Sequence, residues 1–100
     1  MEQFHYQVLI NKFQEIIGVV GIRLPSHIYH LHIAAKYHRM GLGEKLWSSV
    51  KDNAYGKVNE FTVNSSIYAA PFYKKMGFVA GPKQFQNEVA FIPMKFNYNN

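Results

Sequence analysis

The spacing of hydrophobic and polar positions predicts a chain built mainly of strands. Residues 4–10 alternate apolar and polar positions, the period of two that is typical of a strand with one buried face. Residues 16–23 are apolar on both faces and rich in β-branched side chains, which predicts a central strand. The same criteria predict further strands at 27–34, 57–63, 78–80 and 89–95. Pro93 indicates that the last of these carries a bulge or forms an exposed edge.

Two stretches have the helical period instead. In the first, Leu42, Leu46 and Val50 recur at helical spacing with Trp47 beside them, and Gly56 is the expected stop. A crossover helix here makes strand 57–63 run parallel to strand 27–34. The second helix should be short, capped by Ser65 or Ser66, with an inward stripe of Ala69, Phe72, Tyr73 and Met76.

These elements predict an α/β fold with a mixed, largely antiparallel sheet and two helices. One hundred residues, 48% of them hydrophobic, are enough for one small folded domain spanning 1–100. The absence of cysteine excludes disulfides, thiolate metal sites and a cysteine nucleophile. No apolar run reaches the ~20 residues of a membrane span, and the amino terminus lacks a signal-peptide pattern. We therefore expect a cytoplasmic protein without a membrane partner.

The formal charge of +5 comes from 11 Lys and Arg against 6 Asp and Glu. The basic residues are scattered along the chain and form neither a basic helix nor a long basic run. This distribution favours general solubility or attraction of an anionic cofactor over nucleic-acid binding, so no nucleic-acid partner is expected.

A strand, a glycine-bearing loop and a helix follow one another between residues 29 and 50. At the start of such a helix, unpaired backbone N–H groups and the positive end of the helix dipole point at one spot. Gly41 and Gly43 let the main chain turn sharply and approach a ligand closely. The segment is therefore a candidate anion site, with simple packing of the helix as the alternative.

Two motifs resemble the Gcn5-related N-acetyltransferase (GNAT) superfamily. The segment HRMGLG at 38–43 is similar to the family's acetyl-CoA loop, Gln/Arg-x-x-Gly-x-Gly/Ala, and FYKKMGF at 72–78 is similar to the end of its later helix. The resemblance covers roughly residues 15–96. The family's usual first strand and the two helices after it have no counterpart, so the side that faces the acceptor should be open, completed by another subunit, or lost.

The resemblance implies acetyl-CoA as cosubstrate and assigns residues to it. His38 stands where the family prefers Gln or Arg, and Asn64 or Ser66 would reach the cofactor in place of a family asparagine. Main-chain groups of one strand would pair with the pantetheine arm, and the loop would hold the pyrophosphate. The residues concerned are Leu31, His32 and Ile33 on the strand and Arg39, Met40, Gly41, Leu42, Gly43 and Glu44 in the loop.

Tyr73 is the residue that the resemblance makes catalytic. A tyrosine O–H can stabilise or protonate the CoA thiolate that leaves when an amine attacks the thioester. The alternative is a core tyrosine on the inner face of its helix. The attacking amine needs a base, for which His30, His32 and Glu60 are the candidates. A metal site at His27, His30 and His32 is not expected, because no cysteine or acidic motif accompanies them.

The favoured function is transfer of acetyl from acetyl-CoA to a primary amine by direct attack in a ternary complex. The alternatives are a CoA-binding or interaction module without acceptor chemistry and a basic nucleic-acid-binding domain. The acceptor, a small molecule or a protein amine, stays open. A homodimer is expected, with a monomer as the alternative, because several aromatic residues have no evident place in a small core: Phe4, Tyr6, Phe85, Phe91, Phe96 and Tyr98.

Overall fold

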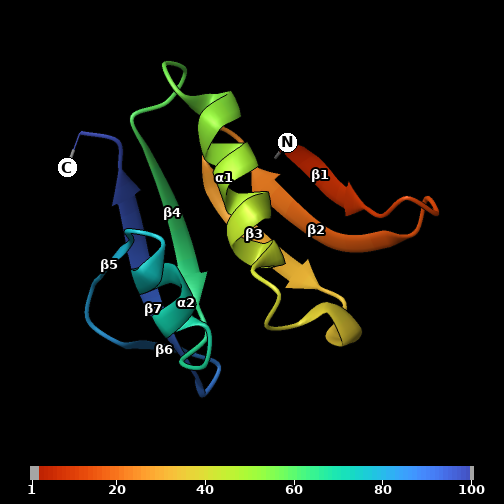
Figure 1. The fold of residues 1–100 in the computed structure, drawn as a ribbon. Coiled ribbons are helices and arrows are strands. Elements are labelled where there is room, and N and C mark those ends of the chain that lie inside the picture. The colour runs from red at the N-terminus through yellow and green to blue at the C-terminus, as the bar shows by residue number, and fades with distance from the viewer. Residues whose placement is uncertain (1–2, 100) are drawn as a thin grey trace.

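A seven-stranded sheet carries both α-helices on one face (Figure 1). The computed structural model describes residues 3–99. Along the chain the elements are β1 (Phe4–Ile10), β2 (Ile16–Arg23), β3 (His27–Ile33), a 3₁₀ turn (Ala35–Tyr37), α1 (Leu42–Ala54), β4 (Glu60–Ser65), α2 (Ala70–Lys75), β5 (Val79–Ala80), β6 (Gln84–Gln86) and β7 (Val89–Asn97). The predicted fold class is confirmed. No helix within the described residues is long and apolar enough to cross a membrane.

The predicted element bounds are confirmed for β1 and β2 and need correction further along. Strand β4 begins at Glu60 rather than at Lys57, because the turn after α1 continues beyond Gly56, whose φ is +82°. Strand β6 lies between the predicted strands 78–80 and 89–95, in a segment that the sequence pattern leaves as a hairpin loop. Ser66 accepts a hydrogen bond from the N–H of Ala69 and so caps the turn that precedes α2, whereas the N-cap residue of the helix itself, Ala69, makes no side-chain cap bond.

The sheet order is β1-β2-β3-β4-β7-β5, with β6 also paired to β7, and β3 and β4 are its one parallel pair among residues 3–99. That pairing joins only His27 to Thr62 and Ile28 to Val63. Beyond these two residue pairs the strands diverge toward the end of the molecule where α1 begins (Figure 1). The predicted parallel arrangement is confirmed, and the divergence leaves a gap in the middle of the sheet.

Strand β7 is an interior strand, so the expectation that Pro93 marks an exposed edge or a bulge is wrong. Pro93 is in register with Asn64 of β4, and its carbonyl accepts a hydrogen bond of 2.8 Å from the Gly81 N–H on the other side. Both backbone groups of a strand residue point to the same neighbour. The missing N–H of Pro93 therefore faces the interruption between β5 and β6, where little pairing is lost.

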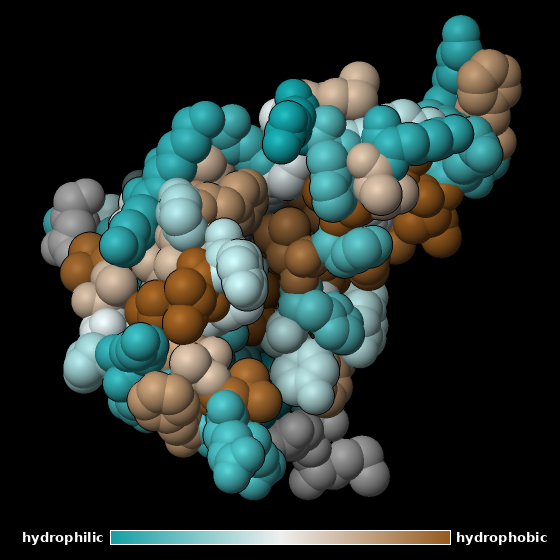
Figure 2. Space-filling view, turned by 90° about the horizontal axis from the view of Figure 1, so that it is seen from below, coloured by the Kyte–Doolittle hydropathy of each residue, from teal (hydrophilic) through white to brown (hydrophobic). Residues whose placement is uncertain are grey.

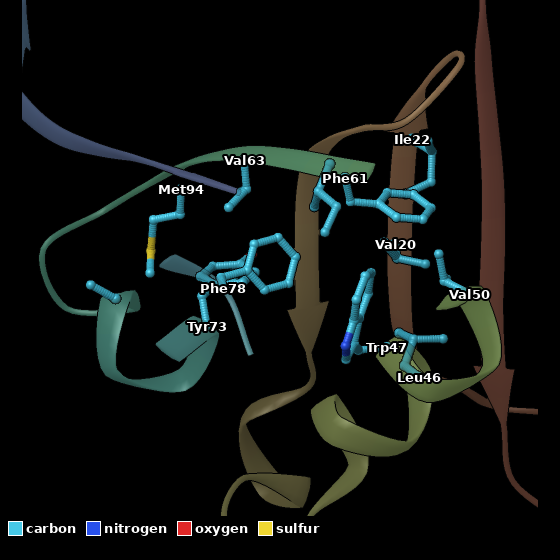
Figure 3. Packing of buried hydrophobic residues seen from close by; sticks show 12 residues of the cluster. Val20, Ile22, Leu46, Trp47, Val50, Phe61, Val63, Tyr73, Phe78 and Met94 are labelled. Atoms are coloured by element: carbon cyan, nitrogen blue, oxygen red, sulfur yellow. The ribbon is translucent and has the colours of Figure 1, made fainter. Parts of the chain in front are cut away.

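The core lies between the helices and the sheet, around Trp47 of α1 (Figure 3). Trp47 is 2% exposed, and its ring centroid lies 5.2 Å from that of Phe61, 5.1 Å from Phe78 and 5.3 Å from Phe96. Phe96 and Tyr98 pack against this cluster, so their expected role as surplus surface aromatics is wrong. The expectation holds for Phe4, Tyr6 and Phe85, which are exposed.

The other face of the sheet carries no helix among the described residues. A bulge in β3 sets which side chains it presents: Gly21 pairs with His30 but Ile22 pairs with Ile28, so Tyr29 is an extra residue. After the bulge Leu31 and Ile33 pack toward the core, while His30 and His32 are exposed on the opposite face, which we call the open face.

Candidate acetyl-CoA cleft

A cleft of about 680 Å³ lies where β3 and β4 diverge, bounded by the loop before α1 and by α2. Figure 2 views the molecule from this end, where hydrophobic residues reach the surface between hydrophilic ones. Most of the predicted cofactor residues line the cleft, together with the predicted catalytic tyrosine. They are Leu31, His32, Ile33, His38, Arg39, Gly41, Leu42, Gly43, Glu44 and Tyr73.

The loop at one end of the cleft presents backbone N–H groups that have no helical partner. Gly41 is the N-cap residue of α1, with φ at +74°, and no side chain caps this helix. The first turn of a helix leaves its N–H groups unpaired, here those of Leu42, Gly43 and Glu44. Arg39 also has a positive φ, +65°, and lines the same cleft. Partial positive charge and a cationic side chain therefore meet at one place that suits an anion.

The two glycines of the loop have different physical roles. A Cβ at Gly41 would meet no atom within 4 Å, so packing does not require glycine here. Glycine instead permits the left-handed backbone conformation and leaves space in front of the helix. A Cβ at Gly43 would lie 3.1 Å from Cε1 of Phe72, tighter than ordinary contact. Gly43 therefore permits α1 to pack closely against α2, and the packing interpretation of the loop applies to this residue.

Strand β3 supplies main-chain groups along one wall of the cleft. The N–H of Ala34 donates to Ile17 O of β2, and alternate residues of a strand bond alternate neighbours. The N–H and C=O groups of Leu31 and Ile33 consequently point toward β4, whose pairing with β3 has already ended at Ile28. His38 Nε2 lies 2.7 Å from the Ile33 carbonyl oxygen, to which it donates. His38 thus holds the loop against the strand.

Tyr73 lines the cleft from α2 while most of its ring is in the core. It is 7% exposed, and its ring packs edge-on against Phe72 at 5.2 Å and Phe78 at 5.3 Å. Burial raises the pKa of the Tyr73 hydroxyl to about 12, so the group stays protonated at neutral pH. The core and catalytic interpretations are both compatible with this position, because the ring packs and the residue still reaches the cleft.

Five of the predicted site residues do not line the cleft: Met40, His30, Asn64, Ser66 and Glu60. Glu60 stands at the other end of β4, where its carboxylate lies 3.7 Å from Lys95 Nζ. Since His27 is level with Thr62, Glu60 and His32 are roughly 20 Å apart along the strands. Of the three candidate bases, His32 alone borders the cleft, and the described residues contain no group of side chains able to hold a metal.

A second cavity of about 600 Å³ lies over β4, β7 and β5 and was not predicted. His27 lines it, and its Nδ1 lies 2.7 Å from the Thr62 hydroxyl oxygen. Burial, and secondarily the nearby Arg23 cation, lowers the pKa of His27 below its usual value. The cavity begins beside the last paired residues of β3 and β4, next to the point where the strands diverge. The sequence marked His27 only as one of three nearby histidines.

Solved acetyltransferase structures share this fold. A GCN5-related N-acetyltransferase from Rhodopseudomonas palustris superposes with a TM-score of 0.84 at 22% identity, over 94% of this chain and 61% of that one. An acetyltransferase from Bacillus cereus gives 0.81 at 20% identity, over 96% and 74% of the two chains. Tetrahymena Gcn5 gives 0.80 at 18% identity, over 94% and 68%. This chain therefore spans about three fifths to three quarters of the length of these proteins.

The family is shown by the sequence itself. Residues 1–98 match the acetyltransferase (GNAT) domain, a longer stretch than the 15–96 covered by the two motifs and their neighbourhood. No protein of curated function matches the chain. With nearly its whole length matched and its sheet and two helices arranged as in solved acetyltransferases, the chain belongs to the GNAT family.

Proposed function

We propose that the protein transfers acetyl from acetyl-CoA to a primary amine by direct attack in a ternary complex. The observation that carries the proposal is the cleft itself, in which the candidate anion loop, strand groups without a β4 partner and a buried tyrosine line one space. These groups match three parts of acetyl-CoA: its pyrophosphate, its pantetheine arm with two amides, and its thioester.

The order of these groups along the cleft supports one direction for the bound cosubstrate. The pyrophosphate would accept hydrogen bonds from the N–H groups of Leu42, Gly43 and Glu44, with Arg39 adding charge. The arm would pair with Leu31 and Ile33 in place of the missing β4 neighbour. From Ile33 back to Ile28 the strand offers about 16 Å, so the thioester would lie deep in the gap.

The transfer forms a C–N bond between the amine and the acetyl carbonyl and breaks the C–S bond of the thioester. A thiol has a pKa near ~8.5, well below that of Tyr73, so proton transfer from the tyrosine to the thiolate is uphill. Tyr73 would instead donate a hydrogen bond to the sulfur as its charge develops. The amine proton would pass to His32, directly or through water, because this histidine borders the cleft.

Binding and turnover test the proposal in sequence. Titration calorimetry with acetyl-CoA comes first, followed by release of CoA thiol in the presence of a panel of amines. The chain has no cysteine, so a thiol reagent detects only the product. Binding with turnover on at least one amine is the expected result. Binding without turnover on any amine would favour the alternative, a CoA-binding module, and absence of binding would refute both.

A further inference from the structure

The outer edge of β1 is long and carries none of the usual devices that protect a sheet edge. Strand β1 ends the sheet order, and no strand within residues 3–99 pairs with its outer side. Its seven residues, FHYQVLI, include no Lys, Arg, Asp, Glu or Pro. Natural proteins blunt edges with such residues or with very short strands. The opposite edge follows that rule, since β5 has two residues and β6 has three.

The hydrogen bonds to β2 show which groups of β1 are free to pair outward. The Leu24 N–H donates to the Gln3 carbonyl at 2.8 Å, so odd-numbered residues of β1 bond to β2. The even-numbered residues therefore direct their N–H and C=O groups away from the sheet. The same even-numbered residues are apolar and exposed on the open face: Phe4 at 37%, Tyr6 at 55%, Val8 at 48% and Ile10 at 46%.

We propose that β1 pairs antiparallel with β1 of a second copy of this chain, around a two-fold axis at Gln7. Outward-facing residues must lie opposite one another, and this register brings all seven residues of each strand into the pair. Tyr6 then lies opposite Val8 of the second copy, and Phe4 opposite Ile10. Pairs of aromatic and β-branched residues are among the favourable cross-strand neighbours. The two sheets become one continuous sheet.

The absence of charged residues on β1 favours a second copy of this chain as the partner. Each chain carries +5, so two copies repel wherever their basic residues approach. Strand β1 has no charged residue, and its sequence places no like charges opposite each other when it pairs with itself. The apolar row on the open face also continues across the axis, from Phe4, which packs edge-on against Tyr29 at 5.3 Å, to the same residues of the second copy. This interface does not depend on the proposed acetyl transfer.

Single cysteines test the register, since the natural chain has none. In Gln7→Cys, the two cysteines would form a non-hydrogen-bonded pair with Cα atoms about 4.5 Å apart, within disulfide range. The matched control is His5→Cys, on the same strand and on the same face of it. In the proposed register the two copies of residue 5 lie roughly 14 Å apart, too far for a bond.

The expected result under mild oxidation is a disulfide-linked dimer for Gln7→Cys and none for His5→Cys, read on a non-reducing gel. Light scattering of the unmodified protein at micromolar concentration should give twice 11.6 kDa. Val8→Lys, which sets a charge against Tyr6 of the second copy, should give the single-chain mass, whereas Val79→Lys, on a surface residue of β5 that is 67% exposed, should not. Circular dichroism checks that both variants fold.

The proposal is overturned by a single-chain mass for the unmodified protein or by a mass above that of two chains, which would indicate open-ended assembly. A dimer that survives Val8→Lys would place the interface elsewhere. Equal cross-linking of Gln7→Cys and His5→Cys would refute the register, and the absence of a Gln7→Cys cross-link in a dimer would do the same.

Discussion

Gly41→Asp is the sharpest test of the anion site, because it changes charge where there is room for a side chain. No atom lies within 4 Å of the position of the new Cβ, so the variant creates no collision. The carboxylate would stand before the unpaired N–H groups of the first turn of α1 and could accept hydrogen bonds from them. It would therefore both occupy the site and repel an incoming pyrophosphate.

The structure sets the size of both effects. A non-glycine residue at a φ of +74° lowers the free energy of unfolding by about 1–2 kcal/mol. Capping of α1 by the new carboxylate restores about 1 kcal/mol of it, so the variant should still fold. Two unit charges about 5 Å apart near a protein surface repel by about 3 kcal/mol at an effective dielectric constant of ~20. The affinity for CoA should therefore fall on the order of 100-fold.

Calorimetric titration with CoA at low ionic strength measures this change against two controls. Gly41→Asn adds similar bulk without charge and should weaken binding about tenfold or less, since lost space rather than repulsion is its main effect. Gly56→Asp adds the same charge at a φ of +82°, also with no atom within 4 Å, and should leave the affinity unchanged. Near ~1 M salt the difference between the Asp and Asn variants should shrink. Affinity within threefold of the natural protein for a folded Gly41→Asp would refute the anion site.

Three further predictions concern the tyrosine, the core and a histidine. Tyr73→Phe should lower turnover about 10²–10³-fold with little change in CoA affinity or melting temperature, and unchanged turnover would return Tyr73 to a purely packing role. Phe61→Ala removes a ring that is 1% exposed against Trp47 and should lower the free energy of unfolding by about 3–5 kcal/mol in urea titrations, with a loss below 1 kcal/mol contradicting its central place. The folded-state pKa of His27 lies below its unfolded value, so the unfolded chain binds more protons below about pH 6.5 and stability should fall on acidification. Urea midpoints at pH 7.5 and 5, measured for the natural protein and for His27→Gln, check this. The midpoint should fall less in the variant, and an equal fall in both proteins would show that His27 does not cause the pH dependence.

The elements that could be predicted are those whose pattern is local. Strand β1 follows its alternating pattern and β2 its apolar run from end to end, and α1 ends at Ala54, two residues before the expected stop at Gly56. Strand β6 could not be predicted, because Phe85 stands between two glutamines and the segment becomes a strand only through the neighbouring β7. The prediction for Pro93 was wrong for the same reason. An interior strand can accept this proline only because the pairing beside it is interrupted between β5 and β6, which no local pattern reveals.

The candidate site likewise has one part that a local sequence pattern predicts and another that depends on contacts between distant segments. The loop from His38 to Glu44 is contiguous in sequence, and most of its predicted residues line the cleft. The grouping of Glu60 with the histidines was a statement about the relative positions of two parallel strands, which no local pattern specifies. The contact between Gly43 and Phe72 and the second cavity at His27 likewise arise from packing between distant segments.

The two residue pairs that join β3 to β4 have a consequence for backbone exchange with solvent. Amides at the centre of a sheet are normally the last to exchange, because they open only with global unfolding. Here the amides of Leu31 and Ile33 lie in a middle strand but face a gap, so they should exchange like those of an edge. The molecule therefore consists of two half-sheets held together mainly by a shared hydrophobic core. Fast-exchanging amides are expected between these half-sheets, in the middle of the sheet, as well as at its outer edges.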